Sequence, residues 1–286
     1  TQNMFDFHNL FQLPDPIHVT DIGAAAITEK PIYASLLIAG AAQLSTFDGD
    51  ERQSEGISEA FGPRVKHYAE FLFDGTLQIA QITSPASGMS SLLKPRAAAL
   101  SFFNGFTQFG AVEKTEEVQT ATLDSIADLP AIDFLKMDVQ GAELTILQHG
   151  VAKLTSCVAL QLEVPFICLY DNQPGFGEID VWLRSQGFLP HCFLDIKRWS
   201  IAPTIFNRNF RVPGNQLLEA DIVYIKDPLA MDHFSDQQLK KLAVISDMCL
   251  NSNDLCVHML RELQQRKLVE DGAVDLYLRA CGRNPT

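Results

Sequence analysis

The stretch Ala131–Gly150, AIDFLKMDVQGAELTILQHG, constrains the fold of this chain more than any other part of the sequence. It opens with an apolar run over residues 132–137 that suits a short buried strand. A break at residues 138–141 follows, and apolar residues then recur at helical spacing up to a final glycine. A strand, a turn and a helix form half of a parallel α/β unit, in which ligands bind beyond the carboxyl ends of the strands. We therefore expect Asp138, at the end of the strand, and Glu143, in the helix, to lie at a site.

The string KMDVQGAE at residues 136–143 resembles the signature of the FkbM family of S-adenosylmethionine-dependent methyltransferases. Further matching segments extend the resemblance to about residues 17–227. The resemblance implies a Rossmann-like class I methyltransferase fold, with a mostly parallel sheet and helices on both faces. It also implies S-adenosylmethionine as the cofactor and O-methylation of a sugar, glycan or small-molecule hydroxyl. A divalent metal is possible but is not predicted.

The bulk composition is that of a globular protein rather than a disordered one. The sequence has 286 residues, of which 47% are hydrophobic and 20% are charged, enough to build a full α/β core. Its formal net charge of −13 argues against a nucleic-acid partner, because binding a phosphate backbone requires a basic face.

The six cysteines form no C-x-x-C pair and no zinc pattern, so we expect buried free thiols. The amino end lacks the basic start and the long apolar run of a signal peptide. No apolar run is long enough to span a bilayer. These features favour a reduced, cytoplasmic protein without a membrane span.

A βαβ unit is expected near the start of the chain. Residues 17–23 read as a strand that ends in Asp21 and Gly23, and residues 43–48 read as a second strand that ends in Asp48. A helix beginning near residues 29–31 would connect them, which favours a parallel sheet. In nucleotide-binding folds the glycine turn admits the ligand, and the acid of the second strand accepts the ribose hydroxyls.

The resemblance implies that Asp21 and Gly23 line the methionine end of the cofactor and that Asp48 holds the ribose. The candidate cofactor-binding residues are Asp21, Gly23, Ala24, Phe47, Asp48 and Phe71. Of these, Phe71 lies in a strand expected over residues 65–72. The glycine-rich loop departs from the family pattern, with Ala25 in place of asparagine and Ile27 in place of the last glycine. The alternative function is therefore a non-catalytic methyltransferase-fold binding protein with a degenerate cofactor loop.

A polar loop at residues 84–95 matches a family segment with a Ser-Ser-Leu core. Ser90 and Ser91 are therefore candidate substrate-binding residues, with plain turn residues as the alternative. Lys136 is a third candidate for substrate binding, and an internal role balancing nearby acids is the favoured alternative.

Residues 158–164 predict another buried strand, with Glu163 near its carboxyl end. Asp138 and Glu163 should then lie on neighbouring parallel strands, about 4.8 Å apart. Acids so close shift each other's pKa unless a cation, an ammonium group or a substrate hydroxyl lies between them. The alternative is that Glu163 accepts hydrogen bonds from a helix amino terminus or pairs with Lys136.

Asp138 is the candidate acid or base that acts on the acceptor, and Glu143 and Glu163 would orient the acceptor or hold a divalent ion. We expect the acids at positions 21, 48, 138 and 163 to converge on one cleft.

Three parts are predicted: an amino-terminal arm over residues 1–16, a methyltransferase-like domain over 17–229 and a helical extension over 230–286. The extension shows the apolar spacing of amphipathic helices, which would cap the sheet or pair with a second copy of the chain.

Overall fold

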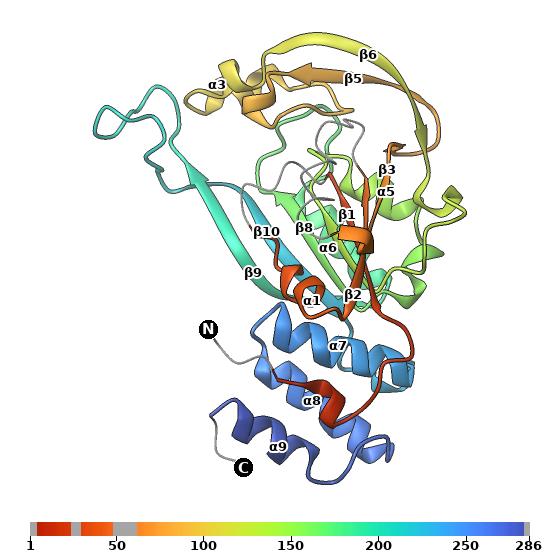
Figure 1. Ribbon diagram of the computed structural model, residues 1–286. Helices are drawn as coiled ribbons and strands as arrows, with labels where there is room; N and C mark the ends of the chain where they lie inside the picture. The colour runs from red at the N-terminus through yellow and green to blue at the C-terminus, as the bar shows by residue number, and fades with distance from the viewer. Residues whose placement is uncertain (1–4, 24–29, 48–61, 283–286) are drawn as a thin grey trace.

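A seven-stranded sheet forms the centre of the molecule (Figure 1). The computed structural model describes residues 5–23, 30–47 and 62–282. The strands of the sheet are β1 (Ile17–Ile22), β2 (Ala42–Phe47), β3 (Val65–Tyr68), β7 (Phe134–Met137), β8 (Ala159–Pro165), β9 (Phe188–Trp199) and β10 (Gln216–Lys226). They lie in the order β3-β2-β1-β7-β8-β10-β9.

The strand β10 runs antiparallel to β8 and β9, and the other pairings are parallel. The central strands β1, β7 and β8 are apolar and buried, as a parallel sheet covered on both faces requires. Because β10 runs in the opposite direction, its amino-terminal half lies at the edge where β7 and β8 end.

One face of the sheet is covered by α1 (Ala34–Ile38), α7 (Asp236–Met248) and the 3-10 turn η1 (Phe7–Asn9). Apolar side chains of α7 and of the sheet form one buried cluster, represented by Leu239, Leu242, Val19 and Val223. The helices α8 (Asn253–Gln265) and α9 (Ala273–Ala280) continue this layer beyond α7 (Figure 1). The helical extension therefore caps the sheet and shares its core, and the predicted boundary at residue 229 stays a prediction.

The opposite face is covered by α5 (Glu143–Gln148) and α6 (Phe176–Ser185), with the 3-10 turns η5 (Leu123–Ser125) and η6 (Lys153–Ser156). Ile146, Leu147, Ile179 and Leu183 pack from these helices onto the sheet. Helices on both faces of a mostly parallel sheet confirm the expected Rossmann-like class I methyltransferase fold.

A second sheet of three strands lies across one end of the main sheet (Figure 1). It consists of β4 (Phe71–Leu72), β6 (Val112–Ala121) and β5 (Leu77–Thr83), in that order. The prediction of one strand over residues 65–72 was wrong, because β3 pairs with β2 in the main sheet and β4 pairs with β6 here. The remaining short elements are η3 (Gly62–Arg64), η4 (Pro85–Ser87), η7 (Met231–His233), α3 (Ala97–Phe102) and α4 (Phe106–Phe109).

All six cysteines are free thiols, but of the expected buried thiols only Cys157, Cys249 and Cys256 are buried, and the other three are partly exposed. Within residues 5–23, 30–47 and 62–282, no helix combines the length and the apolar character needed to cross a membrane.

Candidate functional site

The ends of β1 and β7 touch at Gly23 and Asp138. Gly23 has a φ of +79°, and a Cβ atom built on it would lie 1.9 Å from the carbonyl oxygen of Asp138. The Asp138 amide donates to the carbonyl of Ile22 at 3.0 Å, which fixes the two strand ends together. Only glycine fits here, because it has no side chain to meet Asp138 and because it adopts a positive φ without strain.

Asp21 is buried beneath this contact and is already paired within the protein. Its Oδ1 atom accepts from Lys136 Nζ at 3.0 Å, and its Oδ2 atom accepts from the Tyr33 hydroxyl at 2.5 Å. Burial lowers the pKa of Lys136, but the carboxylates of Asp21 and Asp138 outweigh burial and the net shift is upward. These contacts match the alternative in which Lys136 balances internal acids.

Glu143 caps the signature turn from inside the protein. Its two carboxylate oxygens accept from the amides of Val139 and Gly141, each at 3.0 Å. The residue is only 3% exposed. Burial raises the pKa of Glu143 to about 7, although the two amide hydrogen bonds favour the ionised form. Both oxygens are therefore used to shape the turn.

Gln140 lies between the two acids that were expected to face each other. Its Nε2 atom donates to Asp138 Oδ1 at 2.9 Å and to Glu163 Oε1 at 3.1 Å. The backbone of Gln140 has a φ of +54°, a left-handed conformation that costs about 1–2 kcal/mol for a residue other than glycine. The sequence predicted that the acids shift each other's pKa unless a cation, an ammonium group or a substrate hydroxyl lies between them, and a neutral amide lies there.

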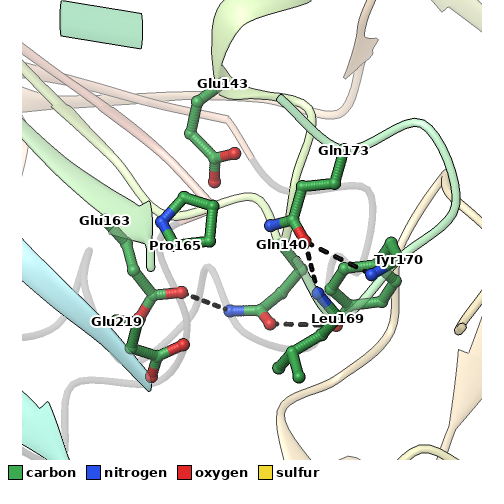
Figure 2. A pocket seen from close by; sticks show the side chains of 8 residues that line it. All are labelled: Gln140, Glu143, Glu163, Pro165, Leu169, Tyr170, Gln173 and Glu219. Carbon is green, nitrogen blue, oxygen red and sulfur yellow. Dashed lines mark hydrogen bonds between the residues drawn. The ribbon is translucent and has the colours of Figure 1, made fainter. Parts of the chain in front are cut away.

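Neighbouring side chains hold Gln140 in this position (Figure 2). The Tyr170 hydroxyl donates to Gln140 Oε1 at 3.0 Å, and the Ser91 hydroxyl donates to the backbone carbonyl of Gln140 at 2.7 Å. Ser90 instead accepts from the amide of Thr83 at 3.1 Å, within its own loop. Ser91 therefore contacts the signature turn, whereas Ser90 shapes the loop that delivers it.

Lys197 of β9 pairs with two acids of the site. Its Nζ atom lies 3.2 Å from Glu163 Oε2 and 2.7 Å from Glu219 Oε1. Burial raises the pKa of Glu163, and the charges of Asp138 and Glu219 raise it further. The ammonium that pairs with Glu163 is thus Lys197 and not Lys136.

A narrow pocket with room for about one water molecule lies over this network (Figure 2). It is lined by Gln140, Glu143, Glu163, Pro165, Leu169, Tyr170, Gln173 and Glu219. Asp138 borders the network with a free acceptor, because only its Oδ1 atom receives a hydrogen bond from the described residues. In that same part of the chain, no group of three histidine, cysteine or acidic side chains is arranged to hold a metal ion.

The structure thus brings Asp21, Asp138 and Glu163 to the carboxyl ends of β1, β7 and β8. Phe47 ends β2 and stacks on Tyr68 with ring centroids 4.7 Å apart. Phe71 lies in the second sheet. The predicted cofactor contacts Ala24 and Asp48, and the loop positions 25 and 27, lie outside the described residues.

Sequence reasoning missed four contributors to the site: Gln140, Tyr170, Lys197 and Glu219. Gln140 was inside the signature string but was treated as part of its spacing. Tyr170 belongs to the turn-rich loop after β8, whose position after a strand end was a usable signal. Lys197 and Glu219 had no local signal, because they reach the site only through the antiparallel return of β10.

Comparisons with known proteins gave one matching family model and several similar solved structures. The model of the methyltransferase FkbM domain matches residues 52–190. No curated protein matches the sequence. A crystal structure of methyltransferase FkbM from Methylobacillus flagellatus KT is similar, with 13% identity and a TM-score of 0.40, over 78% of this chain and 47% of that chain. This chain therefore spans about half the length of that protein.

Two further solved structures are similar to the chain. One is a putative tRNA (m1A22) methyltransferase from Streptococcus pneumoniae, with 11% identity and a TM-score of 0.37, over 94% of this chain and 92% of that chain. The other is magnesium protoporphyrin IX methyltransferase from Synechocystis PCC 6803 with bound S-adenosylmethionine, with 14% identity and a TM-score of 0.35, over 74% and 71% of the two chains. The chain therefore carries a match to the methyltransferase FkbM domain over residues 52–190, just under half of its length.

Proposed function

We propose that the chain transfers a methyl group from S-adenosylmethionine to a hydroxyl group of a small-molecule or glycan acceptor. The observation that carries the proposal is the position of Asp138. It lies at the carboxyl end of β7, against Gly23 at the end of β1, and its Oδ2 atom accepts no hydrogen bond from the described residues.

The charges around Asp138 suit a positively charged cofactor. The carboxylates at this edge are Asp21, Asp138, Glu163, Glu219 and Asp221, and the ammonium groups are those of Lys136 and Lys197. The excess of acids leaves a negative field, which favours the cationic sulfonium of S-adenosylmethionine over its neutral product. The donor set therefore fits this cofactor.

Bound S-adenosylmethionine would supply the methyl group as an electrophile. Asp138 would accept the proton of the acceptor hydroxyl at Oδ2, while Gln140 holds Oδ1 and fixes the orientation of the carboxylate. Glu163 is occupied by Gln140 and Lys197, and Glu143 is occupied by backbone amides. Of the three acids proposed from the sequence, Asp138 is therefore the one with an oxygen that no described residue occupies and that can act as a base.

The lining of the pocket supports a hydroxyl-bearing acceptor. Carboxylate, amide and phenol groups from Glu163, Glu219, Gln173 and Tyr170 line it, with Pro165 and Leu169 as its apolar members. Side chains of this kind form hydrogen bonds with hydroxyl groups, which supports the acceptor class that the family resemblance implied.

Isothermal titration calorimetry with S-adenosylmethionine and S-adenosylhomocysteine tests the proposal. We expect micromolar binding of S-adenosylmethionine that is lost in Asp48→Ala and kept in Asp195→Ala, a control at an exposed acid of β9. Absence of binding at millimolar ligand would reject the enzyme in favour of a non-catalytic binding protein with a degenerate loop.

A further inference from the structure

A second pocket lies at the edge of the sheet opposite Asp138, and we call it the distal pocket. The space inside it is about 600 Å³ when the open solvent at its mouth is included. It is lined by Val151, Leu154, Thr155, Cys157, Trp182, Gln186, Gly187, Phe188 and Lys226. These residues precede β8, begin β9, end β10 and end α6, so the proposed methyltransferase site does not extend to them.

Part of the interior of the distal pocket is an apolar wall. Leu154 and Phe188 are 6% and 5% exposed, and the Trp182 ring adds a flat aromatic wall. The thiol of Cys157 is buried and donates to the carbonyl of Ala159 at 3.1 Å. Burial raises the pKa of Cys157 to about 12, so the thiol is neutral at physiological pH.

Lys226 supplies the only charge among the lining residues. Its Nζ atom lies 5.5 Å from the centre of the Phe234 ring, and no carboxylate within the described ranges comes within ion-pair distance of it. Burial lowers the pKa of Lys226, and the Cys157 thiol is the one titratable neighbour that acts on it. A partly buried ammonium without a carboxylate partner is unusual in a chain with a net charge of −13.

The carboxyl end of α6 also faces this pocket, and open helix carbonyls there would repel an anion. Three of these carbonyls, those of Trp182, Leu183 and Arg184, accept hydrogen bonds from amides. The amide of Gln186 donates to the carbonyls of Trp182 and Leu183, and the amide of Gly187 donates to that of Arg184. The Lys226 ammonium therefore sets the sign of the charge that the pocket accepts.

We propose that the distal pocket binds a small aromatic carboxylate, with its ring against Trp182 and Phe188 and its carboxylate paired with Lys226. The ring replaces solvent on the apolar wall, and the carboxylate gives the ammonium the counterion that it lacks. This site is independent of the proposed transferase activity and of S-adenosylmethionine.

Calorimetry with two matched probes tests the site on the full chain. The probes are 2-naphthoate and 2-naphthalenemethanol, which share a ring system and differ in charge. We expect 2-naphthoate to bind at least about tenfold more tightly, because a charge-assisted hydrogen bond is made by the carboxylate alone. The chain has two tryptophans, so NMR of the indole N–H groups localises the probe. The signal of Trp182 should shift and that of Trp199 should not.

Three variants complete the test. Lys226→Met keeps the apolar stem and removes the charge. It should weaken the binding of 2-naphthoate about tenfold and leave the affinity for 2-naphthalenemethanol unchanged. Val151→Trp fills the mouth from a side chain that is 46% exposed, so it should abolish binding of both probes without disturbing the core. Lys240→Met is the control, because Lys240 lies over the Phe11 ring as Lys226 lies over Phe234 but does not line the pocket.

Binding of 2-naphthoate that weakens in Lys226→Met and disappears in Val151→Trp supports the site. No binding to the wild-type chain at 5 mM probe, or equal affinity in Lys226→Met, overturns it. If Lys226→Met shows no cooperative thermal unfolding transition, the affinity of Val151→Trp for the probes and the shift of the Trp182 signal test the site without it. Unchanged 2-naphthoate binding in a folded Val151→Trp also overturns the proposal.

Discussion

The backbone of Gly23 passes so close to Asp138 that a Cβ atom at position 23 would lie 1.9 Å from the Asp138 carbonyl oxygen. The contact joins the ends of β1 and β7, which are the strands that present the proposed cofactor and acceptor residues. The two neighbouring strands can pack this closely only because residue 23 has no side chain. The same contact connects stability to function, because any shift at Gly23 moves Asp138.

Gly23→Ala should therefore be strongly destabilising. We expect it to lower the free energy of unfolding by about 3 kcal/mol or more, because β1 and β7 must separate to relieve the overlap. Gly88→Ala is the matched control: Gly88 also has a positive φ, +67°, but a Cβ atom there meets nothing within 4 Å. Gly88→Ala should lower the free energy of unfolding by only about 1–2 kcal/mol, the cost of a positive φ in a residue other than glycine. If urea unfolding gives the same decrease in unfolding free energy for both variants, the close approach of Gly23 to Asp138 adds no cost of its own.

Glu143→Gln should remove a pH dependence of stability. In the folded chain Glu143 has a pKa of about 7, against 4.5 as its ordinary value, so the folded state binds this proton more tightly. Stability is therefore lost as the pH rises from about 4.5 to 7, by up to about 3 kcal/mol from this group. Urea unfolding at pH 4.5 and pH 8 measures the loss, which should be smaller in the variant by the contribution of Glu143.

Glu178→Gln is the control for this experiment. Glu178 also accepts from a backbone amide, that of Gly175 at 2.8 Å, but it is exposed at the start of α6. It should leave the pH dependence of the wild-type chain in place. An identical dependence in Glu143→Gln would mean that Glu143 does not titrate in this range.

Lys197→Met should destabilise the chain more at pH 8 than at pH 5. Without the ammonium, Glu163 loses its ionic partner, and its already raised pKa rises further. The folded state then binds a proton more tightly, so stability falls with increasing pH. Breaking a buried pair costs 3–5 kcal/mol, but the Lys197 side chain is 42% exposed, and solvent screening reduces our expectation to about 2 kcal/mol at pH 8.

Lys114→Met serves as the comparison, because Lys114 pairs with Glu116 on the surface, with both side chains at least half exposed. Its unfolding free energy should stay within about 0.5 kcal/mol of the wild-type value at both pH values. A larger effect of Lys114→Met than of Lys197→Met in urea unfolding would contradict the structural role of Lys197.

Asp138→Asn should separate cofactor binding from methyl transfer. The amide keeps the shape of the side chain but cannot accept a proton, so transfer to a sugar panel should fall at least about 100-fold. S-adenosylmethionine affinity should change less than about twofold. Normal turnover in this variant, beside an unaffected Asp195→Asn control, would remove Asp138 from the proposed role.

The sequence alone determined the local parts of this protein. Apolar runs located β1, β7 and β8, and helical spacing located α6 and the carboxyl-terminal helices, because burial imposes a period on each type of element. The signature string placed Asp138 at a strand end for the same reason. Each of these inferences depends on residues that are close together along the chain.

Only the tertiary structure decided how the site is connected. Gln140 lies between Asp138 and Glu163 because the register of β7 with β8 and a left-handed backbone conformation place its amide there. Lys197 reaches Glu163 because β10 reverses direction and pairs with both β8 and β9. Such contacts depend on strand order and register, which arise from packing between distant segments and leave no periodic pattern in the local sequence.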